Sequence, residues 1–101
     1  MFKKINKNSN FFISFNDLID AYTGNEDLRK ELKEYLRVRK LKRAVLTNRA
    51  LELLFERLDK LANSEEEKIL IVKKTIMNGW TSFFELNNSE KKINNKSNKD
   101  L

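Results

Sequence analysis

Apolar residues recur at helical spacing along most of the chain, which predicts a series of amphipathic helices. In "SFNDLIDAY", Ser14 or Asn16 is suited to be the N-cap of a short first helix that ends before Thr23 and Gly24. A second helix is predicted after Asn25, because the next apolar stripe keeps this spacing through "DLRKELKEYLRVRK". That stripe comprises Leu28, Leu32, Tyr35, Leu36 and Arg39.

Two further helices are predicted after residues that favour N-cap positions. Thr47 is the expected N-cap of the third helix, which ends in the turn "LANSEE". Ser64 is followed three residues later by Glu67, which is the spacing of a capping box at the start of the fourth helix. The expected inward face of the third helix comprises Ala50, Leu53, Leu54, Leu58 and Leu61. That of the fourth helix comprises Ile69, Val72, Ile76 and Trp80.

The fourth helix is predicted to end at Asn78 and Gly79. Glycine adopts the left-handed conformation without steric cost, so Gly79 would allow the chain to reverse. The reversal is expected to bring Trp80, Phe83 and Phe84 back onto the helix.

The whole pattern predicts an all-α fold, because it shows no strand-like alternation and contains no proline. We expect one compact domain of three to four helices over residues 14–86, with flexible N- and C-terminal tails. The stretch "FFISF", residues 11–15, is expected to dock on the helices or to supply an interface, so the N-terminal segment, residues 1–13, is expected to be partly docked. Residues 87–101 have almost no apolar side chains and are expected to be disordered.

The composition excludes several classes of function. The 101 residues include no Cys and no His, which removes disulfides, the usual zinc sites, cysteine nucleophiles and histidine proton transfer. Three consecutive glutamates, residues 65–67, fan out around a helix and fit dipole stabilisation better than a metal or acid–base site. We therefore expect a protein that is not an enzyme and has no cofactor. No apolar run approaches the roughly 18 residues of a membrane span, so we expect a cytoplasmic protein without membrane contact.

Basic residues are concentrated near the end of the second predicted helix, in "RVRKLKR". The chain has a net charge of +6, and residues 28–43 alone carry a net +6, which favours an anionic partner such as nucleic acid. These side chains would contact phosphates or an acidic partner. Alternatively, they complement the helix dipole and cover apolar surface with their stems. The candidate contact residues are Arg37, Arg39, Lys40, Lys42 and Arg43.

A second candidate surface surrounds the single tryptophan. A partly exposed Trp beside lysines can stack on the bases of single-stranded nucleic acid. The alternative, which the helical spacing favours, is that Trp80 packs inward at the end of its stripe while the lysines are solvated. The candidate residues are Lys73, Lys74, Asn78 and Trp80.

Three segments between Ala21 and Leu86 together resemble the C-terminal domain of DnaD-like replication proteins of phages and prophages. They are "AYTGNEDLRKELKEYLRVRK", "LTNRALELLFERLDKLA" and "ILIVKKTIMNGWTSFFEL". In better-studied domains of this type, a Tyr-x-x-x-Ile-x-x-x-Trp motif is associated with DNA binding. The matching positions here are Val72, Ile76 and Trp80, with Val in place of Tyr. Members usually carry a winged-helix region ahead of the domain. Residues 1–20 are too few for one, so we expect a detached domain or a small stand-alone phage protein.

Two hypotheses follow from these observations. The first is a helical module that contributes contacts to DNA, single-stranded DNA included, or to replisome proteins. The second is a small stand-alone phage protein that binds a host protein and inhibits or recruits it. A homo-oligomer is left open, because the acidic residues before the second helix could pair with the basic run of another copy in a salt-sensitive contact. Those acidic residues are Asp17, Asp20, Glu26 and Asp27.

Overall fold

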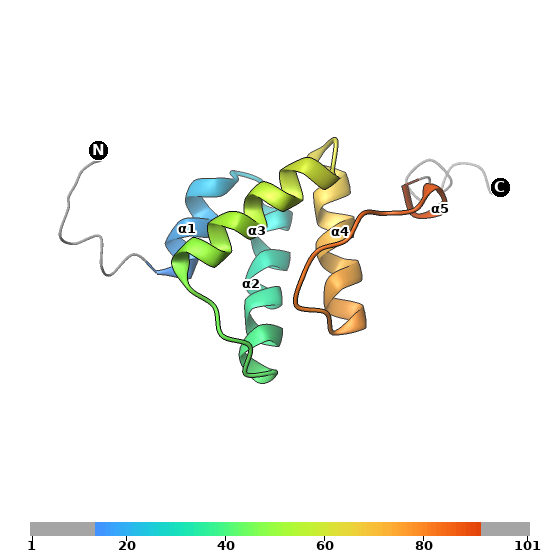
Figure 1. The fold of residues 1–101 in the computed structure, drawn as a ribbon. Helices are drawn as coiled ribbons and strands as arrows, with labels where there is room; N and C mark the ends of the chain where they lie inside the picture. The colour runs from blue at the N-terminus through green and yellow to red at the C-terminus, as the bar shows by residue number, and fades with distance from the viewer. Residues whose placement is uncertain (1–13, 92–101) are drawn as a thin grey trace.

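A computed structural model describes residues 14–91, which form five helices and no strand (Figure 1). The all-α prediction is therefore confirmed for this part of the chain. Four helices make up the body of the domain, and the fifth is a single turn. The helices are α1 (Phe15–Tyr22), α2 (Glu26–Leu41), α3 (Asn48–Leu61), α4 (Glu65–Asn78) and α5 (Asn88–Lys91).

Helices α2 and α4 lie side by side and run in the same direction, so that both end at the bottom of the view in Figure 1. Helix α3 crosses them and contacts α4, while α1 packs against α2 and α3. After α4, the chain turns and runs back along that helix before reaching α5 (Figure 1). The arrangement brings the basic run at the end of α2 close to the turn that follows α4.

The core fills the space between the first four helices and the segment that returns after α4. Tyr35 of α2 and Phe83 of the returning segment are fully buried, and their ring centroids are 4.8 Å apart. Tyr22 stacks on Phe55 at 4.1 Å and so joins α1 to α3. Burial of each large apolar side chain contributes about 1.5–3 kcal/mol. The core residues are Ile19, Leu28, Leu32, Tyr35, Leu51, Phe55, Leu58, Ala62, Ile71, Val72, Phe83 and Leu86.

Polar N-caps begin all four main helices at the predicted places. Ser14, Asn25, Thr47 and Ser64 each accept a hydrogen bond from a backbone N–H of the first turn. The predicted capping box at Ser64 is wrong in its second half: the Glu67 carboxylate accepts a bond from the Asn63 N–H instead. Ser14 has the complete box, with Asp17 as its acidic partner.

The buried face of α3 differs from the predicted one. Leu51, Phe55 and Leu58 are buried, whereas Leu53 is 46% exposed and Ala50 is half-buried. The adjacent apolar residues of "LELLFERL" allow two overlapping stripes, and the structure uses the one that buries the large Phe ring. The helical period alone does not choose between the two stripes.

The prediction that Trp80 continues the inward stripe of α4 is wrong. Gly79 has φ 68° and ends the helix in a Schellman motif, in which the Gly79 N–H bonds to the Ile76 carbonyl and the Trp80 N–H to that of Thr75. This left-handed residue takes Trp80 out of the helical phase, so Trp80 is half-buried and lies outside the core. Phe83 fills the core as expected, but Phe84 is 46% exposed.

The prediction of disorder from residue 87 is also wrong at its start, because residues 87–91 are ordered around α5. Asn87 and Glu90 exchange reciprocal backbone-to-side-chain hydrogen bonds of 2.8 Å, and Glu90 pairs with Lys74 of α4 at 2.8 Å. The expectations for residues 1–13 and 92–101 fall outside the described residues. Phe15, the last phenylalanine of "FFISF", does pack against the core. In the described part of the chain, no helix is long and apolar enough to cross a membrane.

Candidate nucleic-acid interface

The basic run occupies the last turns of α2 and the loop that follows it. Arg37, Arg39 and Lys40 lie on the helix, and Lys42 and Arg43 follow its end. The chain leaves α2 through a Schellman-type turn, with the Arg43 N–H bonded to the Lys40 carbonyl and the Ala44 N–H to that of Arg39. Arg43 has φ 59°, the only left-handed non-glycine residue between positions 14 and 91. The turn therefore holds Arg43 in a backbone conformation that L-residues rarely adopt.

Arg39 is used inside the domain. Its guanidinium donates hydrogen bonds to the Thr81 carbonyl at 2.6 Å, the Val45 carbonyl at 2.8 Å and the Tyr35 hydroxyl at 3.2 Å. Tyr35 also donates a hydrogen bond to the Thr81 carbonyl. Arg39 therefore fastens the loop after α2 and the segment after α4 to the end of α2. Its charge-assisted bonds stabilise the fold, and it is not placed to contact a phosphate.

The other cations of the run face solvent. Arg37 pairs with Glu34 at 3.4 Å, an exposed i, i+3 pair of the kind that contributes little. Lys40, Lys42 and Arg43 are exposed and form no ion pair with any of the residues that the structure describes. We use "basic end" for the surface formed by Lys42 and Arg43 together with the exposed ends of α2 and α4.

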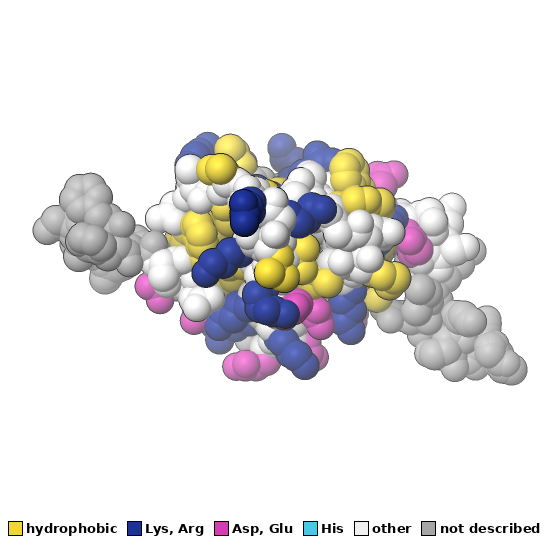
Figure 2. Space-filling model, turned by 90° about the horizontal axis from the view of Figure 1, so that it is seen from below, with side chains coloured by type: hydrophobic (Ala, Val, Ile, Leu, Met, Phe, Trp, Pro, Cys, Tyr) yellow, Lys and Arg dark blue, Asp and Glu magenta, His cyan; other side chains and the backbone are white. Residues whose placement is uncertain are grey.

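Large apolar side chains are exposed among these cations. Leu41 is 71% exposed, Val45 85% and Met77 81%. Figure 2, which looks at the molecule from below, shows lysine and arginine side chains interspersed with apolar ones across this end. Exposed apolar side chains that gather in one contiguous patch mark an interaction surface.

Trp80 lies in a shallow hollow that opens at the same end. The hollow is lined by Lys42, Gly79, Trp80, Thr81, Ser82 and Phe84. The Trp80 and Phe84 rings meet edge to face, with centroids 5.2 Å apart. Two cations lie close to these rings: Lys74 Nζ is 5.8 Å from the Trp80 centroid, and Arg57 Cζ is 5.5 Å from that of Phe84. The structure thus joins Lys42 of the basic run to Trp80 in one hollow.

The remaining candidates near Trp80 have partners within the domain. Lys74 is held by Glu90 at 2.8 Å and also approaches the Glu85 carbonyl at 3.3 Å. Lys73 is exposed and lies 4.0 Å from Glu31 of α2. Asn78 donates a hydrogen bond to the Lys74 carbonyl at 2.8 Å, which satisfies one of the last carbonyls of α4.

Three features of this surface were not predicted. Exposure of Phe84 depends on the chain direction after Gly79, and the contact between Glu90 and Lys74 depends on how α5 folds back. The sequence pattern gave only a weak indication that Leu41, Val45 and Met77 are exposed, namely that these residues fall outside the predicted apolar stripes. Among residues 14–91, no group of three acidic side chains is placed to hold a metal ion.

The largest pKa shifts occur where α1, α3 and α4 meet. Burial, reinforced by the hydrogen bond from its hydroxyl to Asp59, raises the pKa of Tyr22. Burial tends to lower the pKa of Lys68. Its hydrogen bonds to Asp59 and Tyr22 outweigh burial, so the pKa of Lys68 is raised. The pKa of Asp59 is lowered because the bonds from Lys68 and Tyr22 outweigh its burial. These contacts have a structural explanation: they tie three helices together.

The charge of the domain is less positive than the net charge of the chain. Residues 14–91 contain 15 Lys and Arg against 14 Asp and Glu, so most of the net +6 belongs to residues 1–13 and 92–101. The positive charge of α2 is thus offset by acidic residues elsewhere in the domain. The basic end is a local feature of a nearly neutral domain.

Comparison with known proteins gives one family. No curated protein and no solved structure matches the chain. The family model of the YdaU C-terminal domain matches residues 25–100, from the N-cap of α2 through α5 and beyond. The match leaves out α1 and covers about three quarters of the sequence. The chain therefore belongs to the YdaU C-terminal domain family.

Proposed function

We propose that this domain is a non-enzymatic module that contacts single-stranded DNA through its basic end, as part of a phage or prophage replication system. One observation carries the proposal: exposed Lys42 and Arg43 lie at the same end as the half-exposed pair Trp80 and Phe84. Binding of single strands needs this combination, with cations along the backbone and aromatic faces for the bases. The replication context comes from the resemblance to DnaD-like domains.

The conformation of Arg43 supports a functional role for its side chain. A non-glycine residue in the left-handed region costs about 1–2 kcal/mol, and glycine at this position would avoid that cost. The turn instead carries an exposed arginine next to Lys42. A guanidinium in this place can bond to a phosphate through two N–H groups.

Fluorescence anisotropy with labelled oligonucleotides at low and moderate salt tests this proposal. The double variant Lys42→Glu, Arg43→Glu is expected to weaken binding to a single strand at least about tenfold, because it removes two phosphate contacts and adds repulsion. The matched control is Lys30→Glu, Lys60→Glu, which makes the same charge change at exposed positions away from the basic end. The control is expected to lower affinity by only about twofold through the long-range field.

The intrinsic fluorescence of Trp80 provides a second readout, since it is the only tryptophan. Base stacking is expected to quench its emission on addition of a single strand and to shift it much less with duplex. Absence of binding at low salt would overturn the proposal, as would equal losses in the charge-reversal variant and its control.

A second function is favoured by the exposed apolar side chains of the basic end. Leu41, Val45 and Met77 are more exposed than a nucleic-acid surface requires, and such residues are typical of protein contacts. The second candidate is therefore a small phage protein that binds and inhibits or recruits a host protein. Replacing Leu41 and Met77 by Ser distinguishes the two, because it would abolish a protein contact while leaving DNA affinity within about twofold.

A further inference from the structure

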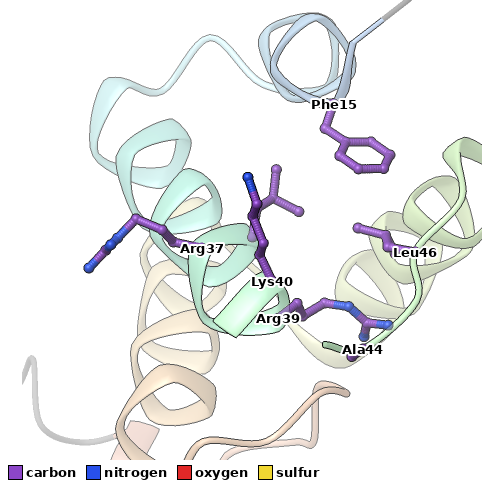
Figure 3. Close-up of a pocket in the computed structure, with 7 residues that line it drawn as sticks. Phe15, Arg37, Arg39, Lys40, Ala44 and Leu46 are labelled. Carbon is purple, nitrogen blue, oxygen red and sulfur yellow. The ribbon is translucent and has the colours of Figure 1, made fainter. Parts of the chain in front are cut away.

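A separate hollow lies on the flank of α2, away from Trp80. It is bounded by the start of α1, the last turns of α2 and the loop before α3, and it has a volume of about 390 Å³. Figure 3 shows Phe15 and Leu46 reaching toward each other across it, with Lys40 beside them. Leu36 and Ala44 complete an apolar lining.

The charged side chains at this hollow are all basic. Among the residues that the structure describes, its lining contains Arg37, Arg39 and Lys40 and no acidic residue. The Arg39 guanidinium is committed to the Val45 and Thr81 carbonyls. Lys40 therefore supplies the free charge at the rim among the described residues, and Arg37 points outward beyond it (Figure 3) and pairs with exposed Glu34. A ligand seated here meets an apolar floor beside a positive rim.

We propose that this hollow binds an acidic peptide segment of a partner protein, which inserts one large apolar side chain between Phe15 and Leu46. Carboxylates flanking that side chain would lie near Lys40 and Arg37. The volume suits one or two large side chains, and anchoring by a buried apolar residue is a general mode of peptide recognition. The inference does not depend on DNA binding at the basic end.

Charge and chemistry argue against two other occupants. A nucleobase would lose hydrogen bonds to water on an apolar floor that offers no replacement. The chain's own N-terminal segment contains Phe11 and Phe12, but residues 1–13 also hold three lysines and no acidic residue, so the charges at the rim would oppose it. An acidic segment that carries one large apolar side chain complements the positive charge of the rim and the apolar lining of the hollow.

The test uses the full chain and a fluorescein-labelled peptide of sequence Asp-Asp-Glu-Leu-Phe-Asp-Glu in fluorescence anisotropy. Binding is expected to weaken with rising salt. It is also expected to be lost when Leu and Phe of the peptide are replaced by Ser. In the protein, Ala44→Leu fills the hollow and is expected to lower affinity at least about tenfold. Single-stranded DNA affinity should stay unchanged in that variant, which separates this site from the basic end.

Two charge variants test the rim. Lys40→Glu is expected to weaken peptide binding at least about fivefold, whereas Lys60→Glu, an exposed control on α3, changes it less than about twofold. Circular dichroism and the melting temperature show whether each variant is folded. If Ala44→Leu loses its fold, Leu46→Ser is used in its place, with the same expectation.

Three results would overturn the proposal. One is absence of peptide binding by the wild-type chain at low salt. Another is binding that Ala44→Leu or Leu46→Ser leaves unchanged in a folded protein. The third is peptide binding that becomes much tighter when Phe11 and Phe12 are replaced by Ser, because the occupant in the wild-type chain is then its own N-terminal segment.

Discussion

Arg39 is the residue on which the geometry of the basic end depends, since its guanidinium bonds to carbonyls of two separate segments. Replacing it by Gln leaves the Thr81 and Val45 carbonyls without their charged donor. We expect a loss of about 2–3 kcal/mol in the free energy of unfolding, measured as a lower urea midpoint with an unchanged slope. Arg37→Gln, the exposed control two residues earlier, should change stability by less than about 0.5 kcal/mol. Equal effects would show that Arg39 acts as a surface charge.

The two glycines provide a matched test of backbone conformation. Gly79 has φ 68°, and a Cβ there would meet only Lys42 Nζ at 3.9 Å, so Gly79→Ala should destabilise by about 1 kcal/mol through its backbone alone. At Gly24, a Cβ would meet nothing within 4 Å and φ is not positive, so Gly24→Ala should be neutral or stabilise by up to about 1 kcal/mol. Thermal or urea unfolding measures both. A larger loss of stability in Gly24→Ala than in Gly79→Ala would contradict this explanation.

Residue types predicted local backbone features well and distant contacts poorly. Ser14, Thr47 and Gly79 act at caps because their chemistry acts within a few residues along the chain. The prediction that Trp80 faces the core is wrong because the left-handed residue Gly79 changes the direction of the chain that follows it. The role of Arg39 depends on carbonyls 6 and 42 positions away, which no local pattern brings together.

At the scale of elements, α5 combines a local cap with a tertiary contact. Four residues do not form a stable helix by themselves, and this turn is held by Asn87 and by the ion pair of Glu90 with Lys74. The sequence "NNSEKK" has no apolar stripe, so periodicity gave no sign of the turn. The main helices were predicted close to their true bounds, because each has a capping residue and a long apolar stripe.

The attachment of α5 should depend on pH. The bond from Lys74, with that from the Asn87 backbone, lowers the pKa of Glu90 below its ordinary 4.5. A lowered folded-state pKa contributes stability above the unfolded value, and this contribution is lost as the pH falls through the folded value. Amide exchange of residues 87–91 should therefore accelerate at acidic pH, relative to that of the α2 core, after correction for intrinsic rates.

Glu90→Gln should detach α5 at neutral pH, seen as faster amide exchange of residues 87–91. Glu85→Gln is the matched control, since only the backbone carbonyl of Glu85 contacts Lys74. Unchanged amide protection of residues 87–91 in Glu90→Gln would contradict the ion pair as the cause.

For the whole molecule, the distribution of charge separates general attraction from local recognition. Residues 14–91 are nearly neutral, while residues 1–13 carry three lysines and no acidic residue. General attraction to phosphates depends on how many cations are near, whereas single-strand preference depends on the aromatic faces at the basic end. The two effects should therefore respond to different substitutions.

Replacing Lys3, Lys4 and Lys7 by Gln lowers the net charge from +6 to +3. We expect weaker binding at low salt and a shallower dependence of log affinity on log salt, to a similar degree for single strands and duplex. Trp80→Ala should instead lower affinity for single strands by about 1–3 kcal/mol and leave the salt slope unchanged. Anisotropy titrations at several salt concentrations measure both quantities. If the lysine variant removes the single-strand preference, recognition does not reside at the basic end, because the charge of residues 1–13 would then account for it.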